Sequence, residues 1–301
     1  MNTKVKICNI EFKNPVIAAS GTFGFGKEFS DYLNINKLGG ICSKGLTLNP
    51  SNGNSGIRLY ETPSGLMNSI GLENPGVKHF LNEELKYMKQ FDTVSIANLG
   101  GHSIYDYEKG SELLEESDCD MIELNISCPN VKDGGMVFGI DPKKASEVIS
   151  KVRKKVTKPL IVKLSPNVTD ISLFAKICED LGADAVSLVN TFNAMAIDIY
   201  KRKAVFDNKT AGLSGPCIKP IALRMVYEAS NSVDIPVIGI GGIMNYKDAI
   251  EFIMAGASLV EVGTANFIDY FSMIKIIEGI EKFMIEEKIN DICEIKNIIG
   301  D

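Results

Sequence analysis

The chain has 301 residues, 45% of them hydrophobic, and carries a formal net charge of −6 at pH 7. Lysine and arginine are scattered along this acidic chain, which argues against nucleic acid or an anionic membrane as its main partner. No apolar run reaches the roughly 20 residues that a membrane-spanning helix needs, and the first residues lack an apolar signal core. We therefore expect a cytoplasmic protein with one large core or two smaller ones.

Cysteine and histidine usage limits the chemistry that the chain can carry. The seven cysteines are widely spaced, none lies in a C-x-x-C pair, and His79 and His102 are the two histidines. A structural zinc, an iron–sulfur cluster or a histidine-based metal site is therefore not expected within this chain. Acid–base chemistry must then use cysteine, lysine or carboxylate side chains.

Short β-rich apolar runs alternate with helical patterns from about residue 15 to residue 265. This alternation is typical of repeated β–α units around a parallel sheet. We expect eight strands, at Val16–Ala19, Gly40–Ser43, Thr93–Ala97, Met121–Ile126, Leu160–Leu164, Ala185–Val189, Val237–Ile240 and Leu259–Val262. Eight such units favour a single (β/α)8 TIM barrel domain over residues 1–301, and a doubly wound open sheet is the alternative.

The segments around these strands carry further signals. Residues 4–13 alternate like a small β-hairpin at the N-terminus, which could close the floor of the barrel. Helix starts are expected at Asp141, Thr169 and Asn245, because side chains of these types cap helix N-termini.

Insertions after strands 2, 4 and 6 interrupt the regular pattern, and the longest are residues 45–76 and 191–215. Long loops inside a compact barrel are more often functional than idle. Polar or glycine residues also occur at the ends of all eight expected strands, where barrel enzymes place their chemistry. These strand ends are Ser20-Gly21, Ser43-Lys44-Gly45, Asn98, Asn125 to Cys128, Lys163, Asn190-Thr191, Gly241-Gly242 and Gly263-Thr264.

Glycines after the last two strands predict an anion site. In Gly239–Ile243 and Gly263–Ala265, backbone N–H groups and helix N-termini can approach a phosphate. The glycines could instead serve tight turns between strand and helix. No G-x-G-x-x-G follows a strand, so a Rossmann-type nicotinamide site is not supported.

Lys163 interrupts the otherwise apolar strand Leu160–Leu164. Burying its ammonium is costly unless it meets an anion or an electron-rich group, such as a flavin ring that gains negative charge on reduction. A structural ion pair is the alternative, with Glu123 on the neighbouring strand as a partner, and the two roles are compatible. Lys44, after the second strand, could equally be a solvated loop residue.

The segment Asn125–Asn130 ends the fourth strand with two carboxamides, a hydroxyl, a thiol and a proline. A site that holds a planar polar ligand beside a thiol explains this ending better than packing does. Residues 129–139 contain glycines and could form a mobile lid. The pKa of a free thiol is about 8.5, so Cys128 could act as a general base after modest tuning. A lone cysteine is also often inert and buried, and the local features leave both interpretations open.

Five linked segments resemble class 1 dihydroorotate dehydrogenases, over essentially the whole chain. They are residues 14–24, 43–47, 61–76, 125–130 and 162–167. The Glu-Thr-Pro-Ser-Gly sequence before Asn68 is similar to the class 1B catalytic subunit rather than to class 1A. Residues 53–58 depart from the usual class 1B pattern, because they lack its two prolines, and this should loosen that loop.

The resemblance implies an FMN-containing barrel that oxidises (S)-dihydroorotate to orotate in pyrimidine biosynthesis. By motif, Cys128 would be the base that removes the C5 proton while a hydride passes from C6 to flavin N5. The substrate would be held by Lys44, Asn68, Ser69, Ile70, Gly71, Leu72, Asn125, Asn190 and Thr191. FMN, one per chain, would be lined by Ser20, Lys44, Gly45, Asn98, Asn125, Lys163, Val189, Gly215, Gly241, Gly242, Gly263 and Thr264.

The resemblance also implies a protein partner, because the chain has neither an iron–sulfur motif nor a nicotinamide motif. Electrons would reach NAD+ through a subunit that carries FAD and a 2Fe-2S cluster, in a heterotetramer built on a homodimer of this chain. The alternatives are a fumarate-dependent class 1A enzyme, a flavin barrel acting on dihydropyrimidines or on dihydrouridine in tRNA, and a non-catalytic barrel. Neither nucleic acid nor a membrane is expected as a partner.

Overall fold

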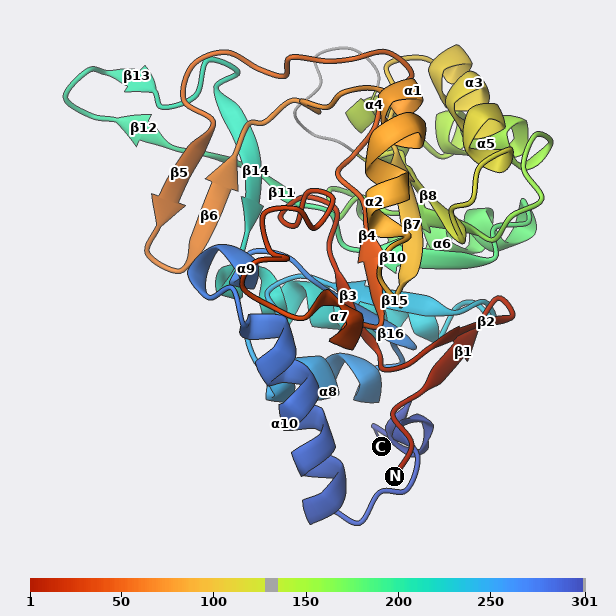
Figure 1. Ribbon diagram of the computed structural model, residues 1–301. Helices are drawn as coiled ribbons and strands as arrows, with labels where there is room; N and C mark the ends of the chain where they lie inside the picture. Colours follow the sequence, from red (N-terminus) through yellow and green to blue (C-terminus); the bar gives the residue numbers. More distant parts are fainter. Residues whose placement is uncertain (128–134, 300–301) are drawn as a thin grey trace.

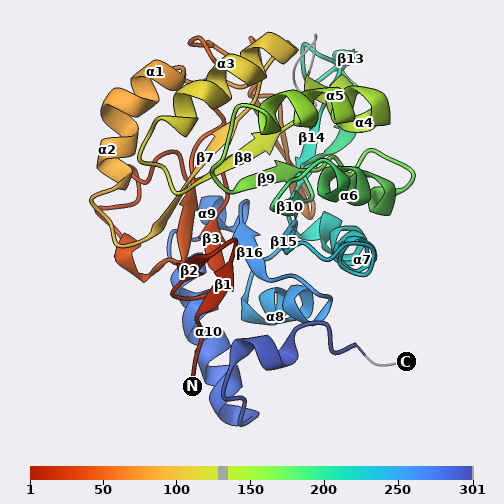
Figure 2. The ribbon, with the colours of Figure 1, turned by 90° about the vertical axis from the view of Figure 1, so that its right-hand side faces the viewer.

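Eight parallel strands close into a barrel at the centre of the molecule, in the order β10-β15-β16-β3-β4-β7-β8-β9 (Figures 1 and 2). The computed structural model describes residues 1–127 and 135–299. The predicted barrel is confirmed, with each strand end within two residues of its expected position, and the open-sheet alternative is wrong. The strands are β3 (Val16–Ala18), β4 (Gly40–Cys42), β7 (Val94–Leu99), β8 (Met121–Asn125), β9 (Leu160–Lys163), β10 (Ala185–Leu188), β15 (Val237–Ile240) and β16 (Leu259–Val262).

Helices cover the outside of the barrel, as Figure 2 shows for α3, α5, α6, α7 and α8. The longer ones are α3 (Ile104–Glu115), α5 (Pro142–Arg153), α6 (Ile171–Asp180), α7 (Lys219–Ser230), α8 (Tyr246–Met254) and α10 (Ser272–Glu286). Shorter segments are α1 (Val77–His79), a π-helical turn (Phe80–Glu84), α2 (Leu85–Met88), α4 (Gly135–Ile140), α9 (Ala265–Ile268) and 3-10 turns at Ile35–Lys37, Pro216–Ile218 and Ile292–Ile295. Among the described residues, no helix combines the length and the apolar character needed to cross a membrane.

Most helix starts follow from their capping side chains. Asp141 caps α5 and Asn245 caps α8, both as predicted. The cap of α6 is Asp170, whose carboxylate accepts a hydrogen bond from the backbone N–H of Leu173 at 3.2 Å. The expected cap at Thr169 is therefore wrong by one residue, because the helix begins directly after the aspartate.

An N-terminal hairpin closes the amino end of the barrel. β1 (Val5–Ile7) pairs antiparallel with β2 (Ile10–Phe12), which confirms the predicted hairpin. Phe12 is fully buried, and the Sγ of Cys8 donates to the carbonyl oxygen of Asp184, directly before β10, at 3.3 Å. The hairpin thus lies at the amino ends of the strands, opposite the predicted functional face.

The two long insertions share one small sheet, which projects from the side of the barrel in Figure 1. Its order is β11-β14-β6-β5, so it combines strands that follow β4 with strands that follow β10. In the insertion after β8, residues 128–134, including Cys128, lie outside the described part of the chain. The insertion strands are β5 (Leu59–Thr62), β6 (Gly65–Asn68), β11 (Phe192–Met195), β12 (Ile197–Asp198), β13 (Lys203–Ala204) and β14 (Thr210–Ser214).

Candidate active site

A cavity of about 540 Å³ lies at the carboxyl ends of the barrel strands, between the barrel and the two long insertions. Most of the predicted site residues contribute to its wall, so the predicted functional face and the cavity coincide. These residues are Ser20, Lys44, Gly45, Asn68, Ile70, Gly71, Leu72, Asn125, Lys163, Val189, Asn190, Thr191, Gly215, Gly241, Gly242, Gly263 and Thr264.

Three predicted residues are not among the described residues that line the cavity. Asn98 is fully buried in the barrel interior and donates from Nδ2 to Glu123. Ser69 is buried within the insertion, where its Oγ accepts a hydrogen bond from Asn54 at 3.1 Å. Cys128 lies outside the described residues. The binding and catalytic roles of all the predicted site residues, these three included, stay predictions.

One wall of the cavity carries linked amides and hydroxyls. Asn190 Nδ2 donates to Asn125 Oδ1 at 3.2 Å and to Ser127 Oγ at 2.8 Å. The Oγ of Ser127 in turn donates to the backbone carbonyl of Lys163 at 3.2 Å. These bonds fix the orientation of the two carboxamides at the cavity wall, and they use both N–H groups of Asn190. Ser127 lies inside the segment Asn125–Asn130, but it was not among the predicted site residues.

Lys44 lies on the cavity wall next to an acidic residue. Its Nζ is 3.9 Å from Glu73 Oε2, and the same oxygen accepts from Arg58 Nη1 at 2.8 Å. The side chain of Lys44 is 35% exposed, so its ammonium remains accessible to an anionic ligand. Glu73 was missed by the sequence analysis, and the available signal was its place directly after the Asn68–Leu72 turn.

Lys163 enters the cavity floor from β9 and is almost completely buried. Its Nζ lies 3.4 Å from Glu123 Oε2, 3.2 Å from Glu261 Oε2 and 3.5 Å from Ser20 Oγ. Burial alone would lower the pKa of Lys163, but the negative charges of Glu123 and Glu261 outweigh burial and raise it. The ion pair with Glu123, which was the alternative to a ligand role, is confirmed, and Lys163 is a fixed cation that also lines the cavity.

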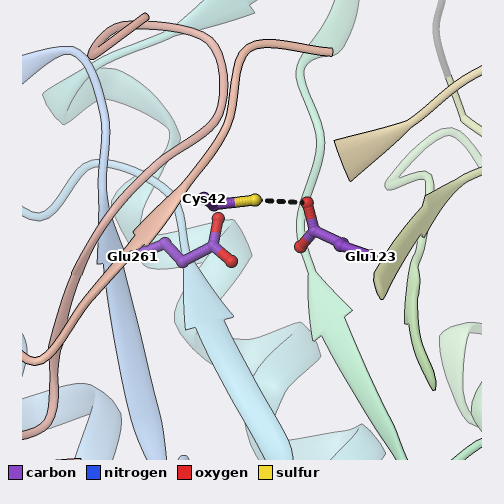
Figure 3. Close-up of side chains that lie close together, drawn as sticks. All are labelled: Cys42, Glu123 and Glu261. Carbon is purple, nitrogen blue, oxygen red and sulfur yellow. Dashed lines mark hydrogen bonds between the residues drawn. The ribbon is translucent and has the colours of Figure 1, made fainter. Parts of the chain in front are cut away.

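Glu261 is the main site residue that the sequence analysis missed. It interrupts the apolar strand β16 just as Lys163 interrupts β9, and this interruption was the available signal. Figure 3 shows its carboxyl group facing Glu123 and Cys42, and one ligand atom of each lies within 4.8 Å of the others. Such a trio could hold a metal ion, but the Lys163 ammonium already supplies a positive charge between the two carboxyl groups.

Glycine turns form another part of the wall. Gly241 and Gly242 follow β15 with φ angles of 132° and 75°, which disfavour residues with side chains. A Cβ added to Gly263, after β16, would meet Ala19 and Thr22 no closer than 3.7 and 3.9 Å. The backbone at Gly263 is therefore open toward the cavity, and a ligand can approach it closely, whereas a Cβ added to Gly241 or Gly242 would meet Ala222 at 2.7 Å or Lys219 at 2.8 Å.

The helices after these two turns differ at their N-termini. In α8, Asn245 and Asp248 cap each other's backbone N–H groups, so this helix end is closed by its own side chains. In α9, Thr264 makes no side-chain cap bond, and its Oγ1 donates instead to Ser214 at 2.9 Å. The expectation of an open helix N-terminus after both strands therefore fails for α8, because its capping residues occupy those N–H groups.

Comparison with known proteins agrees with this geometry. A family model described as dihydroorotate dehydrogenase matches residues 2–284. The chain is 60% identical over 299 residues to a protein of Petrotoga mobilis named dihydroorotate dehydrogenase B (NAD(+)), catalytic subunit, covering 99% of this chain and 100% of that protein. A protein of the same name from Caldicellulosiruptor bescii is 54% identical, and the match covers 100% of each chain. One from Thermoanaerobacter pseudethanolicus is 52% identical, and the match covers 98% of each chain. The chain therefore belongs to the dihydroorotate dehydrogenase family.

Proposed function

We propose that this chain is the FMN-binding catalytic subunit of an NAD+-dependent dihydroorotate dehydrogenase, which oxidises (S)-dihydroorotate to orotate in pyrimidine biosynthesis. The observation that carries the proposal is one cavity in which fixed carboxamides, the open turn at Gly263 and a buried lysine converge. The names of the relatives favour NAD+ over fumarate as the final electron acceptor.

The cavity suits FMN in size and chemistry. Its volume of about 540 Å³ is ordinary for a small-molecule site. A Cβ added to Gly21 would meet nothing within 4 Å, and one on Gly263 would meet nothing closer than 3.7 Å, so both positions leave a cradle for a ligand. Lys163 supplies a fixed cation at the floor, which suits a ring that gains negative charge on reduction. When bound, FMN would supply the hydride acceptor.

The amide wall suits a pyrimidine ring that carries a carboxylate. Asn68, Asn125 and Asn190 present groups that both donate and accept hydrogen bonds, as the edges of a pyrimidinedione require. Lys44 offers an accessible ammonium for the carboxylate, and charge-assisted bonds of this kind are the strong ones. Thr191 lies beside these amides and lines the same cavity.

We assign the general base to Cys128, on the strength of the sequence motif. The residue before it, Ser127, is buried and bonded to Asn190 and to the backbone of Lys163, so the chain leaves the barrel at the amide wall. As a thiolate, Cys128 would take the C5 proton of the substrate. The carboxamides would hold the ring in place during this transfer.

An exposed apolar rim beside the cavity supports docking of a partner protein. Phe267 and Tyr270 line the cavity and are 52% and 51% exposed, and Tyr32 stacks on Tyr270 with 5.3 Å between ring centroids. Exposed aromatic clusters of this kind are typical of protein interfaces. We assign this rim to the subunit that would carry FAD and a 2Fe-2S cluster and relay electrons to NAD+.

A second exposed apolar set lies in the insertion after β10. Met195, Ile197 and Ile199 are 53%, 57% and 70% exposed, and Tyr200 is 92% exposed. We assign this surface to the contact between two copies of the chain. That contact would form the homodimer at the core of a heterotetramer.

Anaerobic mixing of the purified chain with (S)-dihydroorotate tests the proposed function. The flavin absorbance should bleach, and NAD+ should restore it after the partner subunit is added. A protein that stays yellow would contradict the substrate, and a colourless protein would contradict the FMN site. Fumarate-driven reoxidation by the isolated chain would favour a class 1A enzyme instead.

A further inference from the structure

The barrel interior below the cavity is polar, whereas branched apolar side chains usually fill this space in barrels. Six strands each contribute one buried side chain to a polar cluster here. They are Cys42, Asn98, Glu123, Lys163, Ser187 and Glu261. The proposed reaction uses the charge of Lys163 but assigns no role to the other five side chains.

Hydrogen-bond donors are shared unequally between the two carboxyl groups of this cluster. Glu123 accepts from Ser187 at 2.6 Å, from Cys42 at 3.2 Å and from Asn98. Lys163 adds a fourth donor at 3.4 Å. An ionised carboxylate can accept all of these bonds, so Glu123 has the surroundings of a buried anion.

Glu261 has the opposite surroundings. Its Oε2 faces Lys163 at 3.2 Å, but its buried Oε1 has no hydrogen-bond partner among the described residues. A buried anionic oxygen without a donor is costly. The same oxygen would be satisfied as a donor if it carried a proton, and Glu123 is a nearby acceptor (Figure 3).

We propose that Glu261 is a protonated carboxylic acid at neutral pH, and that its proton, shared with Glu123, sets the charge beneath the flavin site. With Glu261 neutral, one carboxylate balances the Lys163 ammonium. When Glu261 ionises, two carboxylates surround one ammonium, and the cavity floor gains a net negative charge. Glu261 is thus a positioning residue that acts through Lys163.

The electrostatics of the cluster agree with this assignment. Burial and the negative charge of Glu123 raise the pKa of Glu261 to about 8, although Lys163 opposes the rise. Burial would also raise the pKa of Glu123, but the charge of Lys163 and the bond from Ser187 outweigh burial and lower it. Burial and the two carboxyl groups raise the pKa of the Cys42 thiol, which keeps it a neutral donor. Cys42, Glu123 and Lys163 are the titratable groups that face Glu261 within the described residues.

The proposal rests on the proposed function for the identity of the ligand above Lys163. A reduced flavin adds negative charge there, which favours the protonated form of Glu261. Above about pH 8, Glu261 has lost its proton, and reduction by the substrate would draw one back from solvent. Each tenfold change in proton affinity between the two redox states shifts a two-electron potential by about 30 mV.

Infrared titration tests for the proton itself. A protonated carboxyl band should be present in the wild-type holoenzyme at pH 7, should fade as the pH rises past about 8, and should be missing in Glu261→Gln. The exposed Glu278→Gln variant is the matched control and should keep the band, because it removes a surface charge only. A wild type without the band at pH 7, or a band that survives in Glu261→Gln, would overturn the proposal.

Redox titration tests the effect on the flavin. The wild-type potential should fall more steeply with pH than that of Glu261→Gln above about pH 8, and the variant should have the higher potential at pH 9. Glu261→Asp keeps a titrating carboxyl group and should restore part of the pH dependence. If the flavin potentials of the wild type and Glu261→Gln changed with pH in parallel, the proposed effect of Glu261 on the flavin would be overturned. A flavin that binds but is not reduced by dihydroorotate would contradict the proposed function and leave both tests of Glu261 valid.

Discussion

The two ends of the barrel use the same eight strands in opposite ways. At the carboxyl end, a cavity of about 540 Å³ is lined by amides, glycines and a buried lysine. At the amino end, a space of about 150 Å³ remains, mostly between aliphatic side chains such as Val5, Ile7 and Ile253. The N-terminal hairpin closes one end of the barrel, and the other end is left open and carries charged side chains, so ligand binding is confined to the carboxyl end.

Replacing the proposed base should have the largest effect of all the changes. It should alter the rate of flavin reduction at the carboxyl end and leave the packing at the amino end unchanged. Cys128→Ser should slow flavin reduction by dihydroorotate by about 10²–10⁴-fold, because a tuned general base is lost, while FMN stays bound. Stopped-flow measurement of flavin bleaching checks this. Cys293→Ser, at the amino end, is the matched control and should keep the wild-type rate. Loss of FMN from Cys128→Ser would indicate a structural role instead.

A core substitution at the amino end should lower the stability of the fold and leave the rate of flavin reduction unchanged. Phe12 is fully buried, so Phe12→Ala should lower the free energy of unfolding by about 3–5 kcal/mol. Urea unfolding measures this loss, and the protein that remains folded should reduce its flavin at the wild-type rate. An equal loss of rate would show that the two ends are not independent.

Filling the open turn after β16 should weaken cofactor binding without unfolding the chain. A leucine in Gly263→Leu would extend into the space left for FMN, and overpacking of this kind costs about 1–3 kcal/mol, or about 5-fold to 150-fold in affinity. Fluorescence titration of the apoprotein with FMN measures the change. Gly263→Ala adds one carbon at ordinary contact distance and should bind FMN as the wild type does. Equal affinity in all three proteins would place the cofactor elsewhere.

The last expected effect is a difference in how stability depends on pH. The pKa of Glu261 is raised to about 8 in the folded state, above its unfolded value of about 4.3, so the folded state binds more protons between these values. The wild type should therefore lose stability as the pH rises through this window and level off above it. Glu261→Gln should lose less free energy of unfolding than the wild type, so the difference in stability should shift in favour of the variant as the pH rises. Urea unfolding at pH 5, 7 and 9 checks this, and parallel curves would contradict it.

The barrel strands were predictable because their signals are local. Val237–Ile240 and Leu259–Val262 match the observed strands residue for residue, since short apolar runs between turn residues suffice to mark them. The sheet shared by the two long insertions was not predictable. It pairs Asn68 with Gly212, which lie 144 positions apart, and periodicity within either segment carries no information about such pairing.

By itself, the sequence determined the order of the elements, the polar strand ends and the family, because these depend on local patterns and linked motifs. Tertiary structure alone decided how the buried charges are arranged. Lys163 and Glu261 each interrupt an apolar strand, but the sequence does not show that they meet. Nor does it show that Glu123 receives the Ser187 and Cys42 donors while Oε1 of Glu261 has no partner among the described residues, because those donors come from strands that face one another only after the barrel closes.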